Sequence, residues 1–203
     1  MDLLEKYKEA WDNQPENSNK VSKGEIYKMM KSKSSSIVKW IFIIGLIEFI
    51  LISSSYFFLD IEESIQAYEN IGLNKYFMLF NTIAGSAIVL YFLYRFYINY
   101  RSISTTENTK SLMNQILNTR KTVRNYVLIN LTYLAIFYVI ATILMVNKQF
   151  TDLSTLHTVG IIIASLIALA VMLTVIWLIY QLLYGILLNK LNKNYKDLAK
   201  LDE

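Results

Sequence analysis

The chain has 203 residues, of which 54% are hydrophobic and 18% are charged, and it contains no cysteine. These proportions are typical of a membrane protein and argue against a soluble domain. Without cysteine there are no disulfides and no thiolate metal sites, and a single histidine disfavours a histidine metal site. We therefore expect no metal and no cofactor. The net charge of +4 is explained by basic residues that flank membrane spans, so we expect no direct binding of nucleic acid.

Residues 1–20 are predicted to form a cytoplasmic amphipathic helix followed by a linker. The apolar side chains of the helix are Leu3, Leu4, Tyr7 and Trp11. The last three of them have the i, i+3, i+7 spacing of one helix face. So short a helix is marginal when isolated in water. We therefore expect it to dock on the rest of the chain, on the lipid surface or on a partner.

A second helix is predicted to begin at Ser22 and to lead into the first membrane span. Ser22 and Glu25 have the spacing at which two side chains cap the free amides of a helix start. Residues 21–36 are predicted to be cytoplasmic. The apolar run 37–59 is long enough to cross a bilayer.

Basic side chains near the ends of the spans are candidate ligands for anionic lipid headgroups. Each contributes about 1 kcal/mol when it lies near the membrane surface. The candidates are Lys28, Lys31, Lys33, Lys39 and Arg95.

The remaining chain is divided by its apolar runs into further spans and polar extensions. The predicted units are residues 37–100 with spans one and two, 101–125 as a cytoplasmic helical connection, 126–188 with spans three and four, and 189–203 as a cytoplasmic helix. In the connection, Ser104 and Glu107 repeat the capping pattern, which predicts a helix from about Thr105 through span three.

The C-terminal segment carries an apolar stripe at heptad spacing. Its members, separated by four, three, four and three residues, are Tyr184, Leu188, Leu191, Tyr195 and Leu198. This spacing favours the seam of a coiled coil or helical bundle. The alternative is an amphipathic tail that lies on the membrane surface.

Basic residues predict the orientation of the spans. Residues 1–39 carry eight, residues 95–124 six and residues 189–203 four, whereas the other two connections carry one each. Because positive residues favour the cytoplasm, both termini and the middle connection are predicted to be cytoplasmic. We therefore expect an all-α protein of the bacterial inner membrane, with four transmembrane helices whose cytoplasmic extensions form a small bundle.

Glu48 is the residue best placed to carry chemistry, eleven residues from either end of span one and so near the bilayer midplane. An ionised carboxylate at that depth costs at least about 2.5 kcal/mol and must be protonated, paired or hydrated. One interpretation is a proton or cation site. The other is a protonated carboxyl group that is hydrogen-bonded to a neighbouring helix. The candidate donors are Asn81, Ser86, Asn130 and Tyr133.

Two further expectations concern chemistry. At about 1.5 Å per residue, Arg95 is predicted to differ from Glu48 by about 15 Å in depth, which is too far for a pair. The sequence contains no phosphate-binding loop, nucleophile elbow, zinc-protease motif or dinucleotide fingerprint. We therefore expect that the protein is not an enzyme.

The N-terminal part resembles a known family. Residues 4–11 (LEKYKEAW), 25–30 (EIYKMM) and 33–40 (KSSSIVKW) resemble small four-span membrane proteins of Bacteroidota, especially of flavobacteria. The short helix that ends at Trp11, ahead of a membrane anchor, is similar to the cytoplasmic ends of membrane-bound anti-sigma factors of that phylum. The resemblance implies that this helix, or the lower bundle, binds a sigma factor through apolar anchors.

These observations lead to two functional hypotheses. The first is an integral inner-membrane protein whose cytoplasmic helices bind a protein partner, with a sigma factor as the most concrete candidate. The alternative is a small transporter, a channel or a subunit of a membrane complex that uses Glu48. Anionic lipids and a second copy of the chain are further candidate partners.

Overall fold

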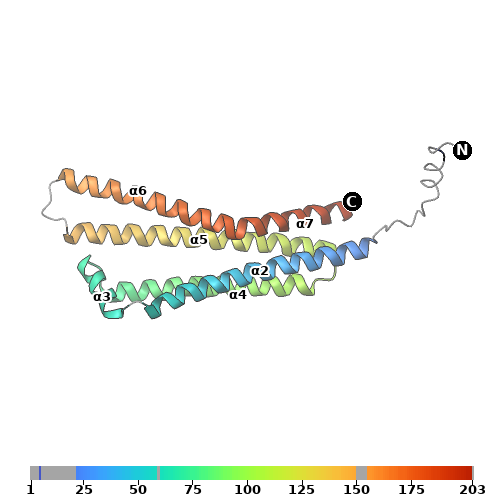
Figure 1. Ribbon diagram of the computed structural model, residues 1–203, viewed down its shortest axis with the longest axis horizontal. Coiled ribbons are helices and arrows are strands. Elements are labelled where there is room, and N and C mark those ends of the chain that lie inside the picture. Colours follow the sequence, from blue (N-terminus) through green and yellow to red (C-terminus); the bar gives the residue numbers. More distant parts are fainter. Residues whose placement is uncertain (1–4, 6–21, 59, 150–154, 203) are drawn as a thin grey trace.

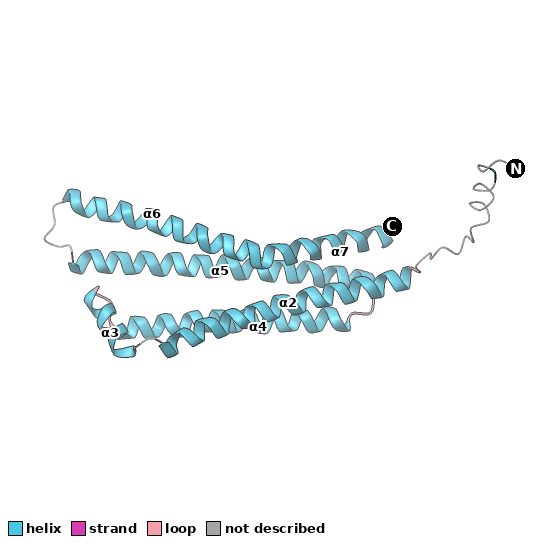
Figure 2. Cartoon of the chain, viewed as in Figure 1, coloured by secondary structure: helices cyan, strands magenta, loops and turns pink. Residues whose placement is uncertain are grey.

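A computed structural model describes residues 5, 22–58, 60–149 and 155–202 of the chain. Every element in this part is helical, and loops join the helices (Figure 2). The elements are α2 (Lys23–Phe58), α3 (Ile61–Asn70), α4 (Lys75–Thr105), α5 (Thr109–Gln149), α6 (Thr155–Tyr180), the π-helix η1 (Gln181–Gly185) and α7 (Ile186–Asp202). The helix predicted over residues 3–11 lies outside the described residues, apart from Glu5.

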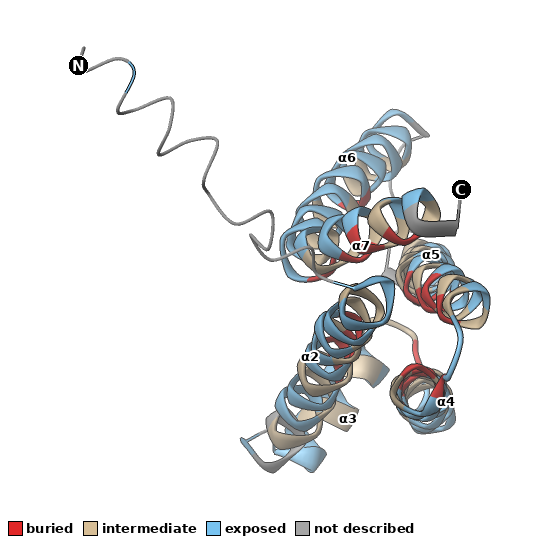
Figure 3. Ribbon diagram, turned by 90° about the vertical axis from the view of Figure 1, so that its right-hand side faces the viewer, coloured by how far each residue is buried: buried red, intermediate tan, exposed pale blue. Residues whose placement is uncertain are grey.

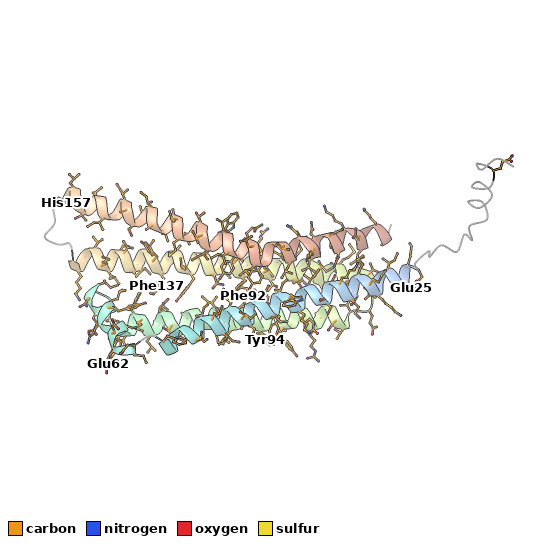
Figure 4. All side chains as sticks on the ribbon, viewed as in Figure 1. Glu25, Glu62, Phe92, Tyr94, Phe137 and His157 are labelled. Atoms are coloured by element: carbon orange, nitrogen blue, oxygen red, sulfur yellow. The ribbon has the colours of Figure 1, made fainter. Side chains whose placement is uncertain are left out.

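Four long helical units run along the molecule (Figure 1). They are α2, α4, α5 and the continuous unit α6–η1–α7, and each is long and apolar enough to cross a membrane. The start of α2, the α4–α5 connection and the end of α7 lie at one end. Glu25 lies at this end, whereas Glu62 and His157 lie at the other (Figure 4). The prediction of an all-α fold with four long apolar helices is confirmed.

The start of α2 carries the predicted reciprocal cap. The backbone N–H of Glu25 donates to Ser22 Oγ at 3.2 Å, and the N–H of Ser22 donates to Glu25 Oε2 at 2.9 Å. The bonds from Ser22 hold the pKa of the Glu25 carboxyl below its ordinary value. The cap therefore stabilises the folded chain at neutral pH, and this contribution is lost as the pH falls through the lowered pKa.

The predicted start of the third long helix is wrong. Helix α4 continues to Thr105, and the hydroxyl of Ser104 donates back to the carbonyl of Arg101 at 2.8 Å. The side chain that caps α5 is Asn108, whose Oδ1 accepts from the N–H of Ser111 at 2.7 Å. A serine inside a helix can bond to a preceding carbonyl, which removes it as a cap. From Thr109 onward, α5 runs unbroken through the predicted span three.

The most tightly packed core lies towards the end that holds the α4–α5 connection. Buried side chains of α2, α4, α5 and α7 lie on the faces that these helices turn to one another (Figure 3). Fully buried aliphatic members of this core are Val38, Ile41, Ile103, Leu112, Ile116, Val123, Leu191 and Leu198. We call this region the packed bundle. The packed bundle contains the polar helical extensions that were predicted to associate (residues 21–36, 101–125 and 189–203), together with the end of α4.

The apolar stripe of α7 belongs to the packed bundle. Tyr184, Leu191 and Leu198 are buried in its core, and Leu188 and Tyr195 pack against it. The side chain of Asn194 donates to Ser34 Oγ on α2 at 3.1 Å in the same interface. The bundle interpretation of the heptad spacing is therefore correct for this stripe.

The fourth predicted span is not one regular helix. Between α6 and α7 the chain forms the π-helix η1, and the two α-helices meet there at a bend (Figure 1). Gly185 makes room for the folded side chain of Gln181, because a Cβ at Gly185 would lie 3.0 Å from the amide carbon of that glutamine. Such π-turns are common at functional sites.

The acidic connection after α2 forms a short helix that we did not predict. Asp60 Oδ1 caps α3 by accepting from the N–H of Glu62 at 2.9 Å. The turn after α3 contains Gly72 at φ 91°, a conformation that favours glycine. A Cβ there would lie 3.0 Å from the Cβ of Lys148, so this turn packs closely on the end of α5. Lys148 Nζ also donates to the carbonyl of Glu69.

Candidate functional site

A polar pocket lies between the long helices, outside the packed bundle. Its volume is about 260 Å3, and helices α2, α4, α5 and α6 contribute to its wall. The polar side chains that line it are Glu48, Asn81, Thr82, Ser86, Asn130, Tyr133 and Tyr180. We call this pocket the Glu48 chamber. It brings together all the intramembrane polar residues that the sequence singles out, Glu48, Asn81 and Asn130 included.

The carboxyl group of Glu48 is held by two tyrosines at the α6–η1 junction. The hydroxyl of Tyr180 lies 2.7 Å from Glu48 Oε1, and the hydroxyl of Tyr184 lies 3.2 Å from Oε2. Tyr180 and Tyr184, which were not among the predicted donors, are therefore partners of this group. Each oxygen of this half-buried carboxyl group has a tyrosine hydroxyl as its hydrogen-bond partner.

Aromatic rings form the end of the packed bundle that faces the chamber. Tyr126 is central, with its ring centroid 5.3 Å from Phe92, 5.4 Å from Phe96 and 5.9 Å from Tyr184. Its hydroxyl is buried and has no hydrogen-bond partner among the described residues. These rings form an aromatic floor below Glu48, and the Tyr126 hydroxyl lies near the Glu48 carboxyl group and the Tyr180 hydroxyl.

The opposite wall of the chamber is formed by α4 and α5. The Tyr133 hydroxyl donates to Asn81 Oδ1 at 2.5 Å and so links the two helices. One turn further from the bundle, Phe77 and Phe137 stack with their centroids 4.9 Å apart. In Figure 4, Phe92 and Phe137 mark the two aromatic layers, and the chamber lies between their levels.

The chamber is rich in hydrogen-bond acceptors. Asn130 Nδ2 donates to the carbonyl of Tyr126 at 2.8 Å, which leaves its side-chain oxygen free to accept. The hydroxyl of Thr82 donates to the carbonyl of Met78 at 3.1 Å, so lone pairs remain on its oxygen. Among the described residues, no lysine, arginine or histidine lines the chamber. Oxygen atoms around one carboxylate are suited to a small hard cation or a protonated amine.

Along the long axis of the helices, Glu48 lies closer to Arg95 than the sequence predicts. Gly45 packs against α4, because a Cβ on it would lie 3.2 Å from Leu93 and 3.3 Å from Phe96. Glu48 follows Gly45 by three residues on an antiparallel helix. At about 1.5 Å per residue, Glu48 and Arg95 therefore differ by about 5 Å along the axis, not by about 15 Å.

The reason for this correction is that part of the apolar run lies in the packed bundle. Val38 and Ile41, which we assigned to span one, are buried in the bundle core. The centre of the run is therefore not the centre of the part of α2 that lies outside the packed bundle. Glu48 lies towards the bundle end of the apolar region. Arg95 itself is exposed on α4.

Glu48 also borders an apolar groove on the other side of α2. The groove has a volume of about 500 Å3 and is lined by side chains of α2, α6 and η1. Besides Glu48 and Tyr180, they are Ile44, Ile47, Leu51, Ile52, Ile176, Ile179 and Leu183. The carboxyl group thus stands between a polar chamber and an apolar surface.

The other predicted site residues do not meet at one place. The candidate lipid-binding side chains Lys28, Lys33, Lys39 and Arg95 are exposed, and Lys31 is half-buried. The candidate partner-binding residues Leu3, Leu4, Tyr7 and Trp11 lie outside the described residues. Their roles stay predictions. No group of three histidine, cysteine or acidic side chains that could hold a metal occurs within residues 22–58, 60–149 and 155–202.

A known protein family matches almost all of the residues that the structure describes. Residues 24–203 match a family model described as a domain of unknown function, DUF8845. The chain belongs to the DUF8845 family. The match includes every helix that forms the chamber and the packed bundle, and it leaves out the predicted helix over residues 3–11. No curated protein and no solved structure matches this DUF8845 chain.

Sequence reasoning missed the tyrosines that bind Glu48 in this DUF8845 protein. Tyr180 and Tyr184 lie four residues apart, which places them on one helix face. Tyr184 is also the first residue of the heptad stripe. Extending that stripe by one turn towards the N-terminus would have identified Tyr180. The signal was therefore present, but we assigned Tyr180 only to span four and interpreted Tyr184 as part of the stripe, not as a partner of Glu48.

Proposed function

We propose that this chain is a small membrane carrier or channel subunit whose helices hold a small monovalent cation at Glu48. The observation that carries the proposal is a carboxylate with two tyrosine donors and no basic neighbour, at the end of an acceptor-rich chamber. A cation approaching from the chamber would meet the carboxylate together with the free oxygens of Asn130 and Thr82. Because a single carboxylate lines the chamber, monovalent ions and protonated amines are favoured over divalent ions.

The proposal includes membrane insertion with both termini in the cytoplasm. Large exposed apolar side chains are numerous on the parts of the helices beyond the packed bundle, as on Ile50, Leu79, Leu128 and Ile167. Such surface is costly in water and favourable in lipid. The basic residues that predict a cytoplasmic side cluster at the end that holds the packed bundle. The chamber then lies within the membrane and the bundle below it.

Cation binding is expected to stabilise the purified full chain in lipid nanodiscs. A ligand present at 100 times its dissociation constant adds about 2.7 kcal/mol to the free energy of unfolding. We would measure thermal unfolding in lithium, sodium, potassium, ammonium and methylammonium chloride at fixed ionic strength. Glu48→Gln keeps the size of the side chain and its contacts with the tyrosines, yet removes the charge. It should abolish the stabilisation by the preferred cation.

Glu62→Gln is the matched control, because it removes one carboxylate from α3, at the far end of the molecule (Figure 4). This variant should respond to the cations as the unchanged protein does. Unfolding that is the same in every cation would contradict the proposal. Equal loss of the response in both variants would also contradict it, because the effect would then not depend on Glu48.

The segment before α2 favours a second candidate function, the binding of a cytoplasmic protein such as a sigma factor. The reciprocal cap fixes the start of α2 at its first turn, so the predicted amphipathic helix is a separate segment that precedes α2 in the chain. An apolar face on so short a helix needs a surface to cover it.

Leu4→Ala combined with Trp11→Ala is expected to release a soluble partner that purifies with the protein from its native membrane. Removing two apolar anchors of a helix-in-groove contact typically costs several kcal/mol of binding free energy. Glu48→Gln should leave that partner bound. Mass spectrometry of proteins retained by each variant measures this difference. The second candidate function fails if the same proteins are retained by both variants.

A further inference from the structure

We infer that the protein has a specific binding site for one anionic phospholipid, between α5 and the junction of η1 and α7. The site does not depend on Glu48 or on a cation. It is distinct from the exposed lysines of α2. It consists of two adjoining pockets, one basic and one apolar, that share a wall.

The basic pocket has a volume of about 610 Å3. Three cations line it from α5, Arg120, Lys121 and Arg124, and the opposite side carries the amides of Gln181 and Asn189. Among the described residues, no acidic side chain lines this pocket. Arginine and lysine beside neutral amides match a phosphate group in charge and in hydrogen-bonding capacity.

The apolar pocket continues directly from the basic one. Its volume is about 310 Å3, and Arg124, Gln181, Gly185 and Leu188 line both pockets. Away from the shared wall, the lining is mainly apolar and aromatic and includes Trp177. Trp177 is 49% exposed, so its ring forms part of the outer surface at this level.

The order of the pockets along the helices matches the shape of a phospholipid. On α5 the cations come first and the apolar residues Val127, Leu128 and Leu131 follow, as the helix enters the predicted span three. A phosphate on Arg120 and Arg124 would therefore lie at the membrane boundary, with an acyl chain beside Trp177. Basic pockets between helices at this level are suited to anionic headgroups. A soluble anion would leave the adjoining apolar pocket unused.

The π-helix contributes the width of the site. The side chain of Gln181 folds over Gly185. A Cβ atom at position 185 would occupy the same space as this side chain. The amide of Gln181 consequently lies where the two pockets meet. It can donate to an ester or phosphate oxygen at the point where a headgroup joins its chains.

Quenching of Trp177 by brominated lipid tests this site directly. The test uses the full chain with Trp11→Phe and Trp40→Phe, so that Trp177 is the remaining tryptophan. The protein is placed in nanodiscs that contain a small fraction of dibrominated phosphatidylglycerol or of dibrominated phosphatidylcholine. We expect at least tenfold stronger apparent binding of the anionic lipid, with about fivefold lost for each basic residue that is replaced.

The charge variant is Arg120→Gln, Lys121→Gln and Arg124→Gln, and its matched control is Lys193→Gln, Lys196→Gln and Lys200→Gln. The control removes the same charge from exposed positions of α7. Quenching by the zwitterionic lipid should stay equal in both, which shows that Trp177 still faces lipid. The preference for the anionic lipid should vanish in the charge variant only.

Three results would overturn the inference. The first is equal quenching by the two lipids in the parent protein. The second is an equal loss of preference in the control, which would indicate a general effect of net charge. The third is complete loss of preference in millimolar inorganic phosphate at constant ionic strength, which would identify a site for a free anion.

Discussion

Replacing Tyr180 and Tyr184 together by phenylalanine is expected to lower the free energy of unfolding by about 3 kcal/mol. The two hydroxyls are the hydrogen-bond partners of the Glu48 carboxyl group. A hydrogen bond to a charged group contributes about 1.5–3 kcal/mol, and a half-buried carboxylate falls at the low end of this range. Reversible unfolding by dodecyl sulfate in mixed micelles would measure the change. Tyr91→Phe with Tyr94→Phe is the control, because both residues are exposed on α4.

The reason for this loss can be tested by adding Glu48→Met to the double variant. An apolar side chain of similar length no longer needs donors, and replacing all partners of a buried polar contact can be nearly neutral. The triple variant should therefore return to within about 1 kcal/mol of the unchanged protein. If the triple variant is as unstable as the double variant, the hydroxyls act through packing and not through the carboxyl group.

Ile116→Ala is expected to destabilise the protein by about 3 kcal/mol, because the side chain is fully buried in the packed bundle. Removing a buried aliphatic side chain costs about 2–5 kcal/mol through lost transfer energy and the cavity that remains. The same unfolding measurement applies. The expected loss is large because this core joins α2, α4, α5 and α7.

Leu117→Ala is the matched control for this prediction. Leu117 is the next residue on the same helix and is 40% exposed. It should cost less than about 1 kcal/mol, as substitutions at partly exposed positions generally do. Equal losses in the two variants would contradict the packing that the structure gives to this part of α5.

The fold could largely be predicted because its strongest signals are long and repetitive. Four long apolar runs predict four long helices, and the heptad stripe of α7 predicts its buried face. Helix ends depend on single hydrogen bonds and are less secure. Ser22 and Ser104 occur in the same pattern, yet only Ser22 caps a helix, because the hydroxyl of Ser104 bonds within its own helix.

The candidate site could be predicted in part. Glu48, Asn81 and Asn130 were identified because polar residues in an apolar run are costly, and they do line one chamber. Span lengths give no register between helices and so could not pair these residues with their partners, although the heptad stripe already marked the helix face that carries Tyr180 and Tyr184. Hydropathy also does not separate protein core from lipid, and Val38 and Ile41 are equally apolar in either setting. Because of this ambiguity, the predicted position of Glu48 along the helix axis relative to Arg95 was wrong.

The π-helix sets the relative orientation of two faces of the unit α6–η1–α7, the face that contacts Glu48 and the face that packs in the bundle. Above it, Tyr180 faces Glu48, and below it, Leu191 and Leu198 face the bundle core. In an α-helix, one residue corresponds to a rotation of about 100°. The length of Gln181–Gly185 therefore sets the rotational phase between the chamber and the bundle. Evolution can exchange side chains in this turn, but adding or removing one residue would turn α7 off its partners while α6 stayed in place.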